Sequence, residues 1–284
     1  MVSAQTAIEW TERTWNPVTG CTKVSPGCDH CYAETIAERF RGGPAFPNGF
    51  DVQLRPNKLG DPLRWRKPQR VFVNSMSDLF HDSVPDEYIA KVFGVMAHAE
   101  AHTFQILTKR HARMRSLLSS DSFRELVFKS VSIELPDVMG DDWPLPNVWL
   151  GVSAENQQWA DIRIPALLDT PAAVRFLSAE PLLGPIDLSN VRRQTDWARL
   201  WAVDSTHETK PLGWVIVGGE SGRAARPMHT DWPRSLRDQC AAANVPFFFK
   251  QAGSALAREW GLKGKGANPS EWPEPFPREY PDVA

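Results

Sequence analysis

The sequence predicts an α/β protein that forms a complete or partial (β/α) barrel of about six to seven parallel strands. Short apolar runs rich in β-branched and aromatic residues recur along the chain, and segments with helical spacing separate them. The runs begin roughly 25 to 45 residues apart, a spacing that suits successive βα units. A first strand is expected before Cys21, and the later runs are Arg70–Val73, Thr103–Leu107, Val148–Val152, Val174–Leu177, Trp214–Val217 and Val245–Phe249.

These runs are nearly continuous in apolar residues, which is typical of strands covered on both faces, as in a parallel sheet. Two of the intervening helices have visible start signals. One is expected after Ser83, with Ser83 as the cap and an acid three residues beyond it, and the other opens at Asp231. Their apolar faces are expected to contain Ile89, Val92, Phe93 and Met96 in the first helix, and Leu236 and Cys240 in the second.

The composition predicts a soluble globular chain. The 284 residues include 32 Lys and Arg against 34 Asp and Glu, a formal net charge of -2, with 42% apolar and 23% charged residues. No apolar run approaches the roughly 20 residues of a membrane helix. The N-terminus has no signal-peptide pattern, so a cytoplasmic location is expected. The near-zero net charge offers no general attraction for nucleic acid, although it leaves room for a local basic groove.

The pattern of apolar runs ends near residue 253. Residues 1–253 are therefore interpreted as one barrel domain with an N-terminal loop that carries cysteines. Residues 254–284 are rich in Pro and Gly and lack periodicity, which indicates an irregular tail.

Polar residues follow the apolar runs, at the expected carboxyl ends of the strands. In parallel α/β barrels the functional site lies at these ends. Polar residues in such places also form turns and cap helices, so each residue taken alone has a purely structural interpretation. The candidates are Asn74, Ser75, Asp78, Lys109, Ser153, Glu155, Asn156, Glu180 and Glu220.

Three of the four cysteines, Cys21, Cys28 and Cys31, lie close together with the spacing C-x6-C-x2-C. Soft thiolates suit both iron-sulfur clusters and zinc. A structural zinc site needs a fourth protein ligand, for which His30 or Cys240 is available. A [4Fe-4S] cluster held by three cysteines leaves one iron open. We favour the cluster; unliganded cysteines are a third interpretation, and Cys240 is expected to be a core residue.

With these motifs the chain resembles the radical S-adenosylmethionine (radical SAM) enzymes and, more narrowly, a phage- and prophage-associated family with a three-cysteine motif. The common radical SAM pattern has three residues between the first two cysteines, where this chain has six. Its Gly-Gly-Glu sequence follows a late strand rather than the second, so an amine-binding role is not transferred to Glu220. The segments that carry the resemblance are Thr14–Cys21, Cys28–Ala33, Asn74–Phe80, Leu107–Arg110, Gly151–Ser153, Ser178–Leu182, Gly218–Gly222 and Phe249–Gln251.

The resemblance implies an enzyme with two cofactors, a [4Fe-4S] cluster on the three cysteines and S-adenosylmethionine (SAM), and with an electron donor as partner. SAM would be cleaved to a 5′-deoxyadenosyl radical. A nucleic acid or nucleotide is one candidate substrate, and the sequence does not predict an oligomeric state. In this scheme Asn74, Ser75 and Asp78 would bind the methionyl amine, Lys109 its carboxylate, Ser153, Glu155 and Asn156 the ribose, while Glu180 and Glu220 would face cofactor or substrate as catalytic residues.

Two other functions are compatible with parts of the sequence. A zinc-stabilised nucleic-acid-binding or adaptor protein without catalysis would use the basic stretch Lys109–Arg115 for phosphate contacts, or that stretch is simply a solvated helix face. A metallohydrolase on a barrel would need a His-rich ligand set, which the sequence lacks.

Overall fold

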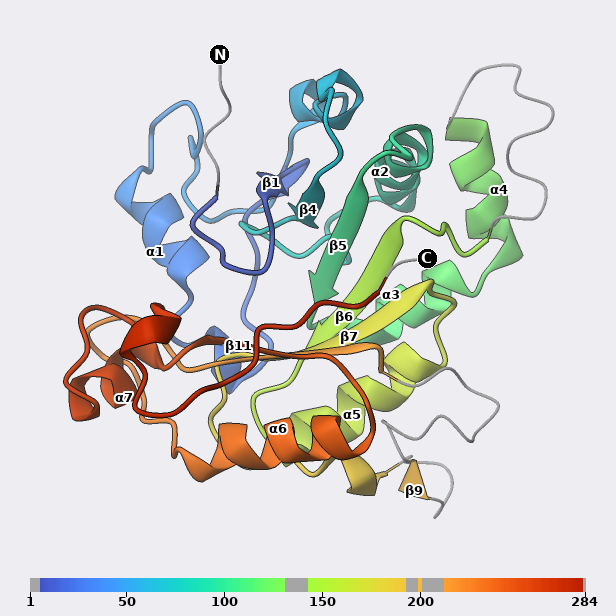
Figure 1. Cartoon of the computed structure of the whole chain (residues 1–284). Helices are drawn as coiled ribbons and strands as arrows, with labels where there is room; N and C mark the ends of the chain where they lie inside the picture. Colours follow the sequence, from blue (N-terminus) through green and yellow to red (C-terminus); the bar gives the residue numbers. More distant parts are fainter. Residues whose placement is uncertain (1–5, 131–142, 193–198, 201–211, 283–284) are drawn as a thin grey trace. The chain divides into compact units, whose positions relative to one another are not determined.

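The computed structural model describes residues 6–130, 143–192, 199–200 and 212–282. Within them the main sheet has seven strands in the order β1-β4-β5-β6-β7-β10-β11, and the fold is an α/β partial barrel, as predicted (Figure 1). The pairs β1/β4, β4/β5, β7/β10 and β10/β11 are parallel. The strands are β1 Arg13–Trp15, β4 Arg70–Val73, β5 Thr103–Thr108, β6 Val148–Ser153, β7 Val174–Ala179, β10 Trp214–Gly218 and β11 Phe247–Gln251.

All six apolar runs are confirmed as strands, and so is the strand expected before Cys21. Every residue of β6 and of β10 is buried, which is why these runs do not alternate with polar residues. The last strand begins at Phe247, two residues later than the run at Val245, and continues to Gln251. Pro246 lacks the N–H that a strand interior requires, so the ladder starts after it.

The described chain divides into two compact units. The first unit contains residues 1–22, 33–150 and 170–173, and the second contains residues 23–32, 151–169 and 174–284. The remaining short elements are β2 Val18–Thr19, β3 Gln53–Leu54, β8 Val191–Arg192, β9 Arg199–Leu200, α1 Tyr32–Arg39 and the 3-10 turns Pro26–Cys28, Pro56–Lys58, Pro62–Arg64, Leu188–Asn190 and Pro269–Glu271.

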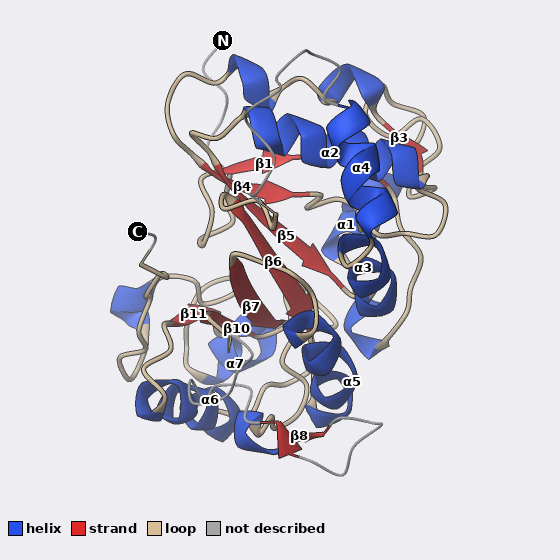
Figure 2. Ribbon diagram, turned by 90° about the vertical axis from the view of Figure 1, so that its right-hand side faces the viewer, coloured by secondary structure: helices blue, strands red, loops and turns tan. Residues whose placement is uncertain are grey.

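In the first unit, helix α2 (Asp86–His98) packs against α4 (Asp121–Ser130), and α3 (His111–Leu118) precedes α4 (Figure 2). The apolar face predicted for α2 is confirmed as buried. The predicted cap is wrong, because the helix begins at Asp86 with Pro85 in the cap position and no side-chain cap. Pro85 already has the backbone angle that leads into a helix, so the start moves past Ser83.

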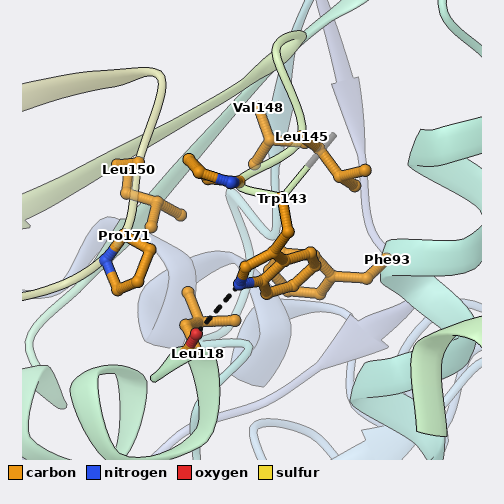
Figure 3. Close-up of a pocket in the computed structure, with 9 residues that line it drawn as sticks. Phe93, Leu118, Trp143, Leu145, Val148, Leu150 and Pro171 are labelled. Atoms are coloured by element: carbon orange, nitrogen blue, oxygen red, sulfur yellow. Dashed lines mark hydrogen bonds between the residues drawn. The ribbon is translucent and has the colours of Figure 1, made fainter. Parts of the chain in front are cut away.

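A small apolar pocket lies in the first unit (Figure 3). Phe93, Leu118, Trp143 and Pro171 are among its lining residues. The Trp143 indole Nε1 donates to the Leu118 carbonyl at 3.1 Å. Because its lining is apolar and this indole donor is satisfied, the pocket is a feature of core packing.

In the second unit, helix α5 (Gln157–Leu168) follows β6, and α6 (Asp231–Ala242) packs on β10 and β11. Leu236 and Cys240 are buried on α6, as predicted. Helix α7 (Gly253–Glu259) follows β11, and the Glu279 N–H donates to the Phe247 carbonyl at 3.0 Å. Among the described helices, none is long and apolar enough to cross a bilayer.

Candidate functional site at the cysteines and polar strand ends

The cysteine motif is divided between the two units: Cys21 belongs to the first, and Cys28 and Cys31 belong to the second. All three are partly exposed and outside any disulfide, whereas Cys240 is fully buried in the core. Among the described residues, no cluster of three or more His, Cys, Asp or Glu side chains is arranged to hold a metal ion. The second unit's segment, residues 23–32, is called the cysteine loop below.

Glu155 bonds directly to the cysteine loop. Its Oε1 accepts from the Gly27 N–H at 3.0 Å, and its Oε2 accepts from Arg163 Nη1 at 3.0 Å. Glu155 and Arg163 are 0% and 1% exposed, so this is a fully buried ion pair. A Cβ on residue 27 would lie only 3.2 Å from the Glu155 Cδ, so a larger residue there would press against this carboxylate.

Glu220 binds the same loop through a second set of contacts. Its Oε2 accepts from His30 Nδ1 at 2.9 Å and from the Arg226 N–H at 2.8 Å, and its Oε1 accepts from Arg226 Nη2 at 2.5 Å. Burial alone would raise the pKa of Glu220, but the hydrogen bonds from Arg226 and His30 outweigh it and lower the pKa to about 2. The carboxylate is therefore ionised at neutral pH.

Arg226 joins Glu220 to the loop backbone. Its Nη2 also donates to the Pro26 carbonyl at 2.8 Å, and its Nη1 donates to Asp29 Oδ2 at 3.1 Å. The planar guanidinium thus bonds to three different residues at once, a geometry that lysine cannot reproduce. The cysteine loop is held on both sides of Cys28.

Ser153 and Asn156, the predicted ribose ligands beside Glu155, make local contacts. Asn156 caps α5, because its Oδ1 accepts from the Trp159 N–H at 3.3 Å. The Ser153 carbonyl accepts from Arg163 at 2.7 Å, and its side chain is buried. For Asn156 the helix-capping interpretation is the one that the structure bears out.

Glu180 and Lys250 form an ion pair that bridges the two strands on either side of β10. Lys250 Nζ lies 2.6 Å from Glu180 Oε1, and the two side chains are 13% and 20% exposed. They come from β11 and from the end of β7, with β10 between those strands. A Cβ on Gly218 of β10 would lie 3.3 Å from the Glu180 Cδ, so this glycine gives the pair room to meet.

In the first unit, Asp78 binds donors from its neighbours rather than facing open space. Its two oxygens accept from Thr108 Oγ1 at 2.7 and 2.9 Å, and it also accepts from the N–H groups of Phe80 and Lys109, both at 3.0 Å. Asp78 is 6% exposed. The carboxylate therefore ties the end of β4 to the end of β5.

Asn74 keeps a donor free. It has a positive φ of 62°, an uncommon conformation for a residue with a side chain. Its Oδ1 accepts from the Val18 N–H at 3.4 Å, while its Nδ2 is buried without a hydrogen-bond partner in the described part of the chain. Ser75, by contrast, bonds to Asn16 through its hydroxyl at 3.3 Å. A ligand with an acceptor atom would satisfy Asn74.

Lys109 and Cys21 complete the predicted residues of the first unit. The Lys109 side chain is half-buried, and its ammonium group makes no ion pair in the described part of the chain. Burial and the Asp78 carboxylate raise the pKa of the Cys21 thiol to about 11, although Arg110 opposes the rise. Arg110 in turn donates to Thr22 Oγ1 at 2.7 Å.

Sequence reasoning missed three charged residues that hold this arrangement: Arg163, Arg226 and Lys250. Arg163 lies within helix α5, and Arg226 follows Glu220 in a segment without periodicity. Lys250 lies in Phe249–Gln251, one of the segments that carry the resemblance, but no role was predicted for it. A buried carboxylate requires a partner of opposite charge, so Glu155 and Glu220 were themselves the sequence signal that such cationic residues are present.

Comparisons with known proteins place the chain in a family. A family model described as "Protein of unknown function (DUF5131)" matches residues 5–279, so the chain belongs to this family. No curated protein matches the chain. Among solved structures, spore photoproduct lyase complexed with dinucleoside spore photoproduct is similar at 10% sequence identity and a TM-score of 0.40, over 82% of this chain and 75% of that one.

Proposed function

We propose that this chain, a member of that family, is a radical SAM enzyme that binds a [4Fe-4S] cluster through Cys21, Cys28 and Cys31. The observation that carries the proposal is the state of these cysteines. None of the three is in a disulfide, each is partly exposed, and the loop with two of them is bonded to two buried carboxylates. Inert structural cysteines are usually buried, as Cys240 is.

The donor set fits an iron-sulfur cluster by its chemistry. Three thiolates are soft ligands, and the imidazole between Cys28 and Cys31 already has another partner, since His30 Nδ1 bonds to Glu220. The raised pKa of Cys21 means that the thiol stays protonated on its own, so a bound cation would have to displace its proton. When bound, the cluster supplies the electron for reductive cleavage of SAM to a 5′-deoxyadenosyl radical.

For SAM binding we assign Asn74 and Lys109 to its acceptor groups. The free Asn74 Nδ2 is a donor and so suits a carboxylate or a hydroxyl better than an amine. Lys109 directly follows β5, the strand next to β4 in the sheet, and it supplies a half-buried positive charge. It remains our choice for the methionyl carboxylate. Ser75 and Asp78 then have a structural role, because Ser75 bonds to Asn16 and Asp78 accepts from the Lys109 N–H.

For the substrate we assign Glu180 and Lys250. The pair offers a carboxylate acceptor and an ammonium donor, both partly exposed, at the carboxyl ends of β7 and β11. Such a pair can hold a substrate group that has both an acceptor and a donor, and it can hold or move a proton between Glu180 Oε1 and Lys250 Nζ. A nucleotide remains a candidate substrate, with the near-zero net charge as the argument against a long nucleic acid.

The basic stretch after β5 gives little support to the alternative of a nucleic-acid-binding protein. Arg113 donates to the Val84 carbonyl at 2.7 Å and to Asp86 at 2.5 Å. Arg110 is committed to Thr22 and Asp82. These guanidinium groups are used inside the first unit, which leaves fewer cations for phosphate contacts.

The proposal is tested by incubating anaerobically reconstituted protein with SAM and dithionite and measuring 5′-deoxyadenosine by chromatography. We expect 5′-deoxyadenosine from the wild type and none from Cys28→Ala. If the wild type carries a cluster but forms no 5′-deoxyadenosine, the result would contradict SAM cleavage, while the cluster assignment would stand.

A further inference from the structure

Four residues of the cysteine loop, Pro26, Gly27, Asp29 and His30, bond to side chains that lie far away in sequence. Gly27 bonds to Glu155, whereas the other three bond to the Arg226–Glu220 pair. These partners surround Cys28 on both sides. All of these residues belong to the second unit.

We infer that Arg226 and Glu220 are positioning residues that hold the cysteine loop in the conformation that presents Cys28 and Cys31 for metal binding. The inference rests on the proposed function for the identity of the metal group. It replaces the catalytic role expected for Glu220 from the sequence. Both of its oxygens already accept hydrogen bonds from Arg226 and His30, so little of the carboxylate is left for a substrate.

The local backbone structure of the loop is short. It includes one 3-10 turn, with bonds from the Cys28 N–H to the Ser25 carbonyl at 2.9 Å and from the Asp29 N–H to the Pro26 carbonyl at 3.1 Å. A single short turn is marginal in water and gains its stability from tertiary contacts. Charge-assisted bonds from Arg226 to Pro26 and Asp29 are contacts of that kind.

Only a glutamate fits the role of Glu220 fully. Its two oxygens receive the fork of Arg226, through Nε at 3.0 Å and Nη2 at 2.5 Å, while Oε2 also receives His30. Glu220→Gln would keep the size but replace one acceptor by a donor, which opposes the fork. Arg226→Lys would keep the charge but lose the simultaneous contacts with Pro26, Asp29 and Glu220.

The test is amide hydrogen exchange of residues 23–32 in metal-free protein, together with iron content after anaerobic reconstitution. In Arg226→Gln and Glu220→Gln we expect exchange at Cys28 and Asp29 to be at least about tenfold faster, since bonds to charged groups contribute that much or more. Reconstituted protein should then lose iron faster, and the electron paramagnetic resonance signal of the reduced cluster should broaden. Arg226→Lys should restore part of the protection.

Arg234→Gln is the matched control, because Arg234 is an exposed arginine of the same unit that pairs with Glu274 and Asp231. It should leave the exchange of the loop and the iron content unchanged. Wild-type exchange rates at Cys28 and Asp29 in both Arg226→Gln and Glu220→Gln would overturn the inference. Failure of the wild type to take up iron would contradict the proposed function instead, and the exchange data would still decide the role of Arg226.

Discussion

In the second unit, the strand-end acids Glu155 and Glu220 both bond to the loop that carries Cys28 and Cys31. In the first unit, Asp78 accepts hydrogen bonds at the ends of two adjacent strands, from Thr108 and Lys109 among others. The first unit instead leaves Asn74 Nδ2 without a partner in the described chain. Both units therefore have polar strand ends. The second unit uses its acids to hold a loop, whereas the first uses Asp78 to join two strand ends and leaves the buried Asn74 donor unsatisfied within the described residues. A polar residue at a strand end acquires a function only through what it contacts.

The largest effect is expected at the cysteines themselves. Cys28→Ala should abolish cluster formation, with iron falling from about four per chain to near zero, because three thiolates are the protein ligands proposed. Cys240→Ala is the matched control, since that thiol is fully buried. It should keep the iron and cost about 1 kcal/mol of unfolding free energy through the cavity it leaves. Equal iron in both variants would contradict the ligand assignment.

The buried ion pair of the second unit should give the next largest effect. Glu155→Gln leaves Arg163, 1% exposed, without its counter-charge. We expect a loss of about 3–5 kcal/mol in the free energy of unfolding, measured in urea. Asp231→Asn breaks an exposed pair with Arg234 and should leave the free energy of unfolding close to that of the wild type. A loss for Glu155→Gln that is no larger than the loss for Asp231→Asn would mean that the buried pair does not stabilise the unit.

These two experiments also mark what the sequence could and could not predict. The strands were predictable because fully buried runs such as Trp214–Gly218 have no polar interruption. The importance of Glu155 and Glu220 was visible from their position, but their role was not. Their partner Arg163 lies in the largely buried helix α5, and their partner Arg226 lies in an irregular segment. Contacts between residues distant in sequence, such as Arg226 with Asp29, leave no periodic signal.

The first unit should show a smaller effect, on ligand affinity rather than stability. Lys109→Met should weaken SAM binding about tenfold, as expected for a lost bond between charged groups. Its unfolding free energy should stay within about 0.5 kcal/mol of wild type, because the ammonium group makes no ion pair with the residues that the structure describes. Lys91→Met, on the exposed side of α2, is the control. The measurement is calorimetric titration of reconstituted protein, and an unchanged dissociation constant would remove Lys109 from the SAM site.

The last prediction is a pH dependence that belongs to Glu220. Its pKa is lowered from 4.5 to about 2 in the folded protein, so its contribution to stability is complete above pH 4.5 and is lost as the pH falls from there to about 2. Glu220→Gln lacks this contribution. The difference in thermal midpoint between wild type and variant should therefore be constant from pH 5 to 7 and shrink below pH 4. A difference that does not change with pH would contradict the ionised state of Glu220.

The central claim is that Cys21, Cys28 and Cys31 hold a [4Fe-4S] cluster. It is tested most directly by anaerobic purification, or reconstitution with iron and sulfide, followed by iron, sulfide and zinc analysis with an electronic spectrum. The account predicts about four irons and four sulfides per chain and a broad band near 400 nm. One tightly bound zinc per chain with no iron after anaerobic reconstitution would contradict it.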